Sequence, residues 1–160
     1  MKIYIHEVDK RLQPDSQPMR YPSFNDDYGV EQDFLKYLSI HKELVVNDPS
    51  EASWHYLPIY WTRWHLNHNY ALEGVSELQE MVDRVIIEPK KTFTVCQYDD
   101  GPVIKLNGVT VLLSSRKGNH GIDIPLLSKQ LKIPWIKPKK TLTASFIGRL
   151  STHPIRKAMQ

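Results

Sequence analysis

Strand-like and helix-like segments alternate along this chain of 160 residues, and their order constrains the fold more than any other feature. Residues 2–8 predict a strand, because β-branched and aromatic side chains alternate there between two faces. Residues 30–44 predict an amphipathic helix, and residues 53–60 return to an extended, aromatic pattern. The order strand, helix, strand, helix, strand favours an α/β fold in which helices flank a Rossmann-like, mostly parallel sheet.

A further helix and four further strands complete this pattern. Ser76 and Gln79 have the spacing of a capping box, and apolar side chains line one face of the helix that they are expected to open. Short apolar runs predict strands at residues 92–96, 109–113, 122–124 and 143–147. Asp48 is a candidate N-cap for a single turn that has Pro49 at its first position.

The length and the cysteine content bound the class of protein. A chain of this size fits one domain, here expected to span residues 1–160. The single cysteine, Cys96, excludes an intramolecular disulfide framework and a four-thiolate zinc site. No apolar run approaches the roughly 18 residues that a membrane span requires, and the first residues do not resemble a signal peptide. We therefore expect a cytoplasmic protein without a membrane span.

The charge is divided unevenly along the chain. The formal net charge is +3, but residues 1–80 carry 7 basic and 13 acidic side chains, whereas residues 81–160 carry 14 and 5. The basic second half is compatible with an anionic partner and equally with a solvated surface.

In a parallel sheet, ligands bind at the carboxyl ends of the strands, so the residues that follow each predicted strand are candidates for a site. These are residues 60–64, 97–101, 114–117 and 148–149. The last two groups contain Arg116 and Arg149, which are candidate substrate-binding residues. Arg149 precedes a predicted turn and helix start, where backbone N–H groups and a guanidinium can together hold a phosphate.

Six of the sixteen aromatic residues lie between residues 54 and 70. An aromatic ring can cover the C–H edge of a sugar, and the polar tips of Tyr and Trp can bond its hydroxyls. The candidates for carbohydrate binding, expected in a loop at a strand end, are Tyr60, Trp61, Arg63 and Trp64. For Trp54 and Tyr56, which lie in the predicted strand itself, a place in the core is the favoured interpretation.

Two adjacent carboxylates, Asp99 and Asp100, follow the strand predicted at residues 92–96. A strand end is a common position for a general acid or base. The alternative is that the two residues only form a turn. No metal site is expected, because the Asp pair has no third oxygen ligand nearby, and His65 and His68 have no further ligand at a convincing distance.

Four segments occur in a distinctive order along the chain. They are KIYIHEV (2–8), DPSEASWHYLPIYWTRW (48–64), IDIPLL (122–127), and ASFIGR (144–149) with HPIRKAM (153–159). This succession resembles that of the exostosin-type glycosyltransferases and spans nearly the whole chain. The family's GRDHFF segment is replaced here by FTVCQYDDGP, in which Asp99 and Asp100 are nearest in place.

The resemblance implies the acceptor-side domain of a two-domain GT-B enzyme whose C-terminal donor-binding domain is absent from this chain. Such an enzyme transfers a sugar from a nucleotide-sugar donor to a glycan acceptor, usually with inversion and without a metal or other cofactor. The base that takes the acceptor proton would be Asp99 or Asp100, with His120 second. Arg149 and the basic second half would help to hold the diphosphate. Since eukaryotic members are anchored in the secretory pathway, a trimmed luminal domain is the alternative to a cytoplasmic location.

Two other functions are alternatives to the transferase. In a stand-alone carbohydrate-binding module, Tyr60, Trp61 and Trp64 would dock a glycan without chemistry, and the protein would bind sugar but not nucleotide. Nucleic-acid binding ranks last, because it needs aromatic and basic residues interleaved on one face, and here the aromatic residues lie mainly in the acidic half.

Overall fold

The structure of the chain, a computed structural model, describes residues 1–16, 29–116, 118 and 120–125. The strands in these ranges are β1 (Ile3–Ile5), β2 (Val45–Val46), β3 (Trp54–Tyr56), β4 (Thr92–Cys96), β5 (Thr110–Leu113) and β6 (Ile122–Asp123). They form one sheet in the order β2-β1-β3-β4-β5-β6, and every neighbouring pair is parallel. The predicted α/β fold with a Rossmann-like parallel sheet is therefore confirmed.

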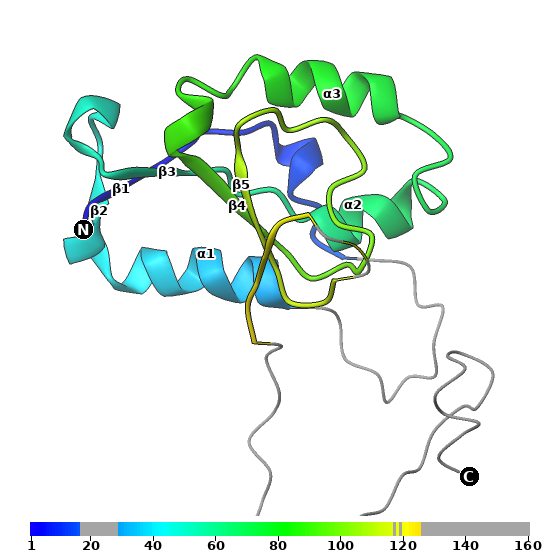
Figure 1. Cartoon of the computed structure of the whole chain (residues 1–160), viewed down its shortest axis with the longest axis horizontal. Coiled ribbons are helices and arrows are strands. Elements are labelled where there is room, and N and C mark those ends of the chain that lie inside the picture. The colour runs from blue at the N-terminus through cyan, green and yellow to red at the C-terminus, as the bar shows by residue number, and fades with distance from the viewer. Residues whose placement is uncertain (17–28, 117, 119, 126–160) are drawn as a thin grey trace, which may run out of the picture. The chain divides into compact units, whose positions relative to one another are not determined.

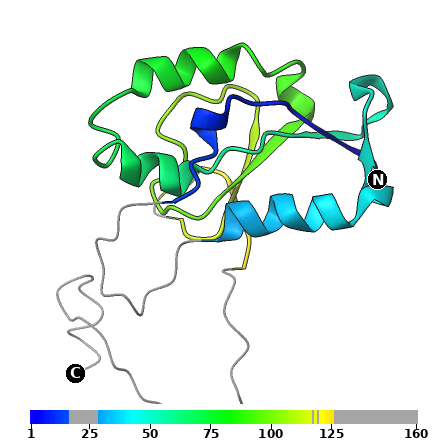
Figure 2. The same ribbon diagram turned by 180° about the vertical axis from the view of Figure 1, so that it is seen from behind.

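Helices cover both faces of this sheet in the described part of the chain. The α-helices are α1 (Val30–Ile40), α2 (Trp61–Asn67) and α3 (Val75–Asp83), and the 3-10 turns are η1 (Lys10–Leu12), η2 (Lys42–Leu44), η3 (Pro49–Glu51) and η4 (Pro89–Lys91). Two opposite views show α1 along one face of the sheet and α2 with α3 along the other (Figure 1, Figure 2). The connections from β1 and from β3 therefore leave the sheet on opposite faces.

Each face of the sheet carries its own hydrophobic cluster. The buried residues of the α1 cluster are Ile3, Val30, Leu38, Tyr56, Phe93 and Val95. The cluster under α2 and α3 consists of Leu12, Leu57, Ile59, Trp61, Trp64, Leu78, Val82, Cys96 and Leu113. In β4, Phe93 and Val95 belong to the α1 cluster and Cys96 to the other, and the whole strand is buried, as a strand covered on both faces requires. Each large apolar side chain buried in this way contributes about 1.5–3 kcal/mol relative to an exposed one.

The first predicted helix ends earlier than its apolar pattern. α1 stops at Ile40, because His41 leaves the helical conformation (φ −91°, ψ 61°). Residues 42–44 form η2, and Val45 and Val46 form β2, which pairs with Ile3 and Tyr4 of β1. The expected helix to residue 44 is therefore wrong by about one turn. Two β-branched valines favour the extended conformation, and pairing with β1 overrides the helical spacing.

The two predicted caps have different outcomes. The capping box at Ser76 is wrong, since α3 begins at Val75 and its N-cap is Gly74, which adopts a left-handed conformation (φ 74°). Gln79 instead donates from its side-chain amide to Asp83 and to the Lys105 carbonyl. The Asp48 cap is confirmed, because its carboxylate accepts from the Ser50 backbone N–H (2.8 Å) at the start of η3.

The later strands lie where the sequence predicts them. β4 occupies residues 92–96, and β5 and β6 are each one residue shorter than the predicted 109–113 and 122–124. The strand expected at 143–147 lies outside the described residues, so it and the single domain over 1–160 stay predictions. Within the described ranges, none of the helices has the length and apolar character needed to span a membrane.

Candidate functional site

The carboxyl edge of the sheet is the candidate site, because the chain connections change faces there. β1 leads into α1 on one face, while the adjacent strand β3 leads into α2 and α3 on the other (Figure 1). In doubly wound sheets, ligands bind outside the carboxyl ends of the strands at such a switch point. β4 is the next strand along, so its end borders the same edge.

A buried glutamate, Glu31, joins three segments at this edge. It is the second residue of α1, and its side chain is 0% exposed. Glu31 Oε1 accepts hydrogen bonds from the Thr62 backbone N–H (3.2 Å), the Thr62 hydroxyl (2.9 Å) and the Gln97 backbone N–H (3.0 Å). Thr62 lies in the first turn of α2, and Gln97 directly follows β4. One carboxylate thus ties the starts of two helices to the end of a central strand.

The burial of Glu31 changes its acid–base behaviour. Removal from water raises its pKa from 4.5 to about 7, although the bonds from Gln97 and Thr62 and the charge of Arg63 act in the opposite direction. Burial disfavours the ionised form of a carboxyl group, whereas hydrogen-bond donors and positive charges favour it. Glu31 therefore changes its protonation state near neutral pH.

Glu31 is not among the residues predicted from the sequence, although a signal for it exists. It precedes Leu35 and Leu38 by four and seven residues, so it lies on the helix face that packs against the sheet. An acid in the apolar stripe of an amphipathic helix is rarely buried without bonded partners. Such a position indicates a structural or functional carboxylate.

The predicted residues Asp99 and Asp100 lie in an exposed turn that follows β4. The Gly101 backbone N–H donates to the Tyr98 carbonyl (3.0 Å) and closes the turn, and Gly101 has a positive φ of 71°. The two acids therefore do form a turn, as the alternative interpretation held. Their exposure also leaves them accessible to a ligand, and their role as a base stays a prediction.

The structure brings His120 to the same turn. A Cβ atom built on Gly101 would lie 3.2 Å from His120 Nε2, so the imidazole packs directly against Gly101. His120 also lines a cavity of about 440 Å³ together with Pro102 and Gly121. The three residues predicted to be catalytic thus come together at one end of the sheet.

His65 lies at this edge as well. It is 6% exposed, and its ring lies 4.1 Å from that of Tyr98. His68 faces elsewhere, since its Nδ1 lies 2.8 Å from the Trp64 carbonyl and its ring stacks on Trp64. Among the residues that the structure describes, no group of three or more His, Cys, Asp or Glu side chains could hold a metal ion.

The expected loop at residues 60–64 is wrong, because α2 begins at Trp61. Trp61 and Trp64 are each 2% exposed and belong to the core, and Trp61 Nε1–H donates to Thr94 Oγ1 (2.8 Å). Neither indole presents an open face to a sugar in this structure. The bonds from Thr62 to Glu31 hold the start of this helix, and they join positions that no local sequence pattern relates.

The other predicted aromatic and basic residues have varied surroundings. Tyr60 is half-buried, and the Arg63 guanidinium lies 5.7 Å from the centre of its ring while donating to the Pro14 carbonyl (2.8 Å). Arg116 forms an ion pair with Asp123 (2.9 Å). Arg149 lies outside the described residues. The core position expected for Tyr56 and Trp54 holds for Tyr56, which is fully buried, but not for Trp54, which is 37% exposed.

Two buried histidines lie at the switch point without having been predicted there. His6 follows β1 and His55 belongs to β3, and their ring centres are 5.5 Å apart. Burial, with a smaller contribution from the charge of His55, lowers the pKa of His6 from 6.5 to about 4. His6 is therefore neutral at physiological pH.

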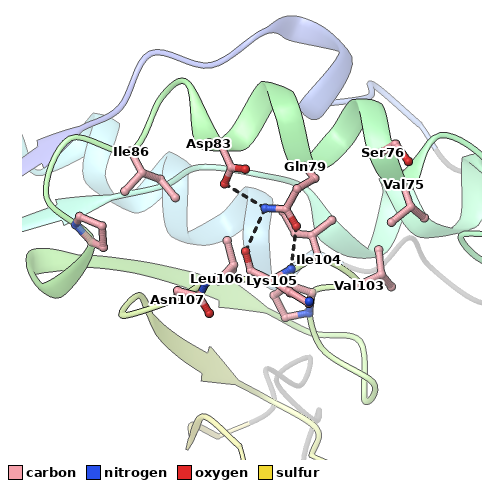
Figure 3. Close-up of a pocket in the computed structure, with 12 residues that line it drawn as sticks. Val75, Ser76, Gln79, Asp83, Ile86, Val103, Ile104, Lys105, Leu106 and Asn107 are labelled. Atoms are coloured by element: carbon pink, nitrogen blue, oxygen red, sulfur yellow. Dashed lines mark hydrogen bonds between the residues drawn. The ribbon is translucent and has the colours of Figure 1, made fainter.

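A groove of about 940 Å³ lies between α3 and residues 102–107 (Figure 3). The Gln79 side chain bonds across it, donating to the Lys105 carbonyl (3.0 Å) and accepting from the Lys105 backbone N–H (2.9 Å). The lining mixes apolar and polar residues, with Asp83 and Lys105 as its charged members. These bonds hold the loop after the Asp99–Asp100 turn against α3.

Comparison with known proteins finds no match: no protein-family model fits the chain, and neither a curated protein nor a solved structure is significantly similar to it. The candidate site is therefore defined by its own residues and geometry. A parallel sheet of this kind serves many chemistries, so the function has to come from the site and not from the fold.

Proposed function

We propose that this chain is the acceptor-side domain of an exostosin-like glycosyltransferase. In this proposal it transfers a sugar from a nucleotide-sugar donor to a glycan acceptor with inversion. The observation that carries the proposal is the exposed Asp99–Asp100 turn at the carboxyl edge of a doubly wound sheet, with His120 packed against Gly101 of that turn. This edge is where such sheets bind ligands, and these are side-chain types that can accept a proton.

The chemistry requires little of this domain beyond positioning and a base. The acceptor hydroxyl loses its proton to the base while its oxygen bonds to the anomeric carbon, and the nucleotide diphosphate leaves with the electron pair of the broken bond. Donor contacts are assigned to Arg149 and the basic second half, together with a separate donor-binding domain. No metal is needed in this proposal, because basic side chains can balance the charge of the diphosphate.

The burial of Trp61 and Trp64 favours this function over a stand-alone binding module. A module of that kind needs exposed aromatic faces, and of its three proposed docking residues only Tyr60 is even half-exposed. The transferase needs accessible polar groups instead, and Asp99 and Asp100 are exposed.

The test is a transfer assay on the protein as its parent reading frame encodes it. UDP-glucose, UDP-N-acetylglucosamine and GDP-mannose are offered with cellotetraose or chitotetraose, and nucleotide diphosphate release and the elongated product are measured. The double variant D99N/D100N should lose at least about tenfold in rate, as expected when groups that assist proton transfer are removed. The double variant E73Q/E80Q removes two exposed charges from the α3 region and should transfer normally.

Two results would contradict the proposal. Unchanged turnover in D99N/D100N would remove both acids from the mechanism. Oligosaccharide binding without nucleotide release, for every donor, would assign the chain to the binding-module class.

A further inference from the structure

The imidazole of His65 is buried without satisfying its hydrogen-bonding groups. The residue is 6% exposed, and neither Nδ1 nor Nε2 has a hydrogen-bond partner among the described residues. A buried polar group left unpaired costs about 1–3 kcal/mol, so proteins rarely leave both ring nitrogens in this state. One reason for such an arrangement is a ligand that supplies the missing partner.

The surroundings of His65 combine aromatic walls with negative charge. Its ring lies 4.1 Å from that of Tyr98 at an angle of 34°, and the edge of Tyr70 approaches at 5.7 Å. Burial lowers the pKa of His65, and the negative charges of Asp100 and Asp99, from the turn after β4, act against that effect. The titratable groups that face His65 are thus two tyrosines and two carboxylates.

The turn that carries Tyr70 is strained. Asn69, Tyr70 and Ala71 have φ values of 53°, 61° and 57°, a left-handed conformation that costs a residue with a side chain roughly 1–2 kcal/mol. The backbone N–H groups of Tyr70 (2.9 Å) and Ala71 (3.3 Å) both donate to the His65 carbonyl, which holds the turn against the histidine. Strain of this kind persists mainly at ligand and active sites.

These features suit a group that accepts a proton at neutral pH. Burial lowers the pKa of His65, and Asp100 and Asp99 act in the opposite direction. The imidazole is therefore neutral before reaction, and the two carboxylates would stabilise its charged form afterwards.

We propose that His65 is the general base of the transfer, with Asp99 and Asp100 stabilising the imidazolium that forms. A ring nitrogen of His65 takes the proton of the acceptor hydroxyl, the hydroxyl oxygen bonds to the anomeric carbon of the nucleotide sugar, and the departing diphosphate takes the electron pair of the broken C–O bond. Because His65 is 6% exposed, this step requires the turn that carries Tyr70, whose ring edge packs against the imidazole, to move aside. This inference rests on the proposed function and deepens it, because it moves the proton-accepting role from the two acids to the histidine.

The test compares H65A with the control H68A in the transfer assay. H65A should lose about 100-fold or more in rate, and added imidazole should restore part of it, because a free base can occupy the space that the substitution opens. H68A should keep the normal rate and show no response to imidazole. In D99N/D100N the rate should remain measurable. The acidic limb of the pH–rate profile should move to lower pH, because the two carboxylates that stabilise the imidazolium are gone.

A normal rate in H65A would overturn the inference. So would a loss that imidazole does not restore in an H65A protein with native circular dichroism, since that result assigns His65 a structural role. H65Q, which keeps a polar side chain of similar length, serves as the second variant if H65A does not fold, and a normal rate in H65Q overturns the inference equally.

A second measurement distinguishes failure of the proposed transferase function from failure of the role assigned to His65. If the unmodified protein transfers from none of the donors, the ¹⁵N resonances of the histidine rings are followed as cellotetraose or chitotetraose is added. A shift confined to His65, with His68 unchanged, supports His65 as the group that bonds a sugar hydroxyl. Unchanged His65 resonances overturn that role too.

Discussion

Glu31 and Gln97 cap each other's segments at the carboxyl edge of the sheet. The Gln97 backbone N–H donates to Glu31 Oε1 (3.0 Å), and Gln97 Oε1 accepts from the Val30 backbone N–H (3.1 Å). The N-cap of α1 is Gly29, which has no side-chain acceptor to offer. The amide of Gln97 therefore satisfies the first N–H of α1, and the position of the Asp99–Asp100 turn is tied to the start of that helix.

Loss of the Thr62 hydroxyl should destabilise the protein most when Glu31 is ionised. A hydrogen bond to a charged group contributes about 1.5–3 kcal/mol, so T62V should lower the free energy of unfolding by about that amount above the pKa of Glu31. Well below that pKa the carboxyl group is neutral, and the loss should be smaller. Urea denaturation on both sides of neutral pH measures the difference. T62S keeps the hydroxyl as a control, and an equal loss for T62V at both pH values would contradict the prediction.

Glu31 and His6 should give stability profiles of opposite slope. The raised pKa of Glu31 means that the folded protein binds its proton more tightly than the unfolded chain does, so this contribution is complete below about pH 4.5 and is lost by about pH 7. The span corresponds to about 3 kcal/mol. The lowered pKa of His6 acts in reverse, since its contribution is complete above about pH 6.5 and is lost as the pH falls to about 4.

In the difference from the unmodified protein, each substitution should therefore remove the slope of its own group. Relative to the unmodified protein, E31Q should become less stable as the pH falls from about 7 to 4.5, because the unmodified protein gains the contribution of Glu31 over that range and the variant does not. H6N should become less stable, by the same comparison, as the pH rises from about 4 to 6.5, because only the unmodified protein gains the contribution of His6 there. The measurement is the urea midpoint across this range, expressed as the difference from the unmodified protein. Difference curves of the same slope for both variants would show that one of the assigned pKa shifts has the wrong sign.

Most of the fold could be predicted from the sequence because its elements follow local periodicity. β4 is a continuous run of buried β-forming residues bounded by Lys91 and Gln97, and the structure places it at residues 92–96. The predictions failed where a distant contact decides the outcome. The helix expected to reach residue 44 ends at Ile40, and the chain instead leads into Val45 and Val46, which pair with β1. Trp61, expected in a loop, begins a helix whose second N–H is held by Glu31.

The candidate site was less predictable for the same reason. Asp99 and Asp100 are visible in the sequence because strand, acids and turn residues are contiguous. Glu31 and His65 acquire their character only when α1, α2 and the end of β4 come together and exclude water. Glu31 is buried but bonded to Thr62 and Gln97, whereas His65 is buried with both ring nitrogens unpaired among the described residues, and residue type alone predicts neither state.

The exposure of the tryptophans predicts different costs for two matched substitutions. W61F removes an indole that is 2% exposed and deprives Thr94 of a hydrogen-bond donor, so it should lower the free energy of unfolding by about 1–3 kcal/mol. W54F acts on a side chain that is 37% exposed and should cost less. Urea denaturation of both variants gives the comparison. Equal losses, or a larger loss for W54F, would mean that Trp61 is not in the core.

Substitutions at Gly101 and Gly118 distinguish the effect of backbone conformation on stability from the effect of side-chain contact at the turn of the candidate site. A Cβ on either glycine would meet the ring of His120, at 3.2 Å from Gly101 and 3.1 Å from Gly118, but only Gly101 of the two has a positive φ. G101A should therefore cost about 1–2 kcal/mol through the left-handed conformation, whereas the flexible imidazole can move away in G118A at little cost. Thermal and urea unfolding of the two variants measure this difference. If G118A is destabilised as much as G101A, then contact with His120, and not the backbone of the turn, fixes this end of the sheet.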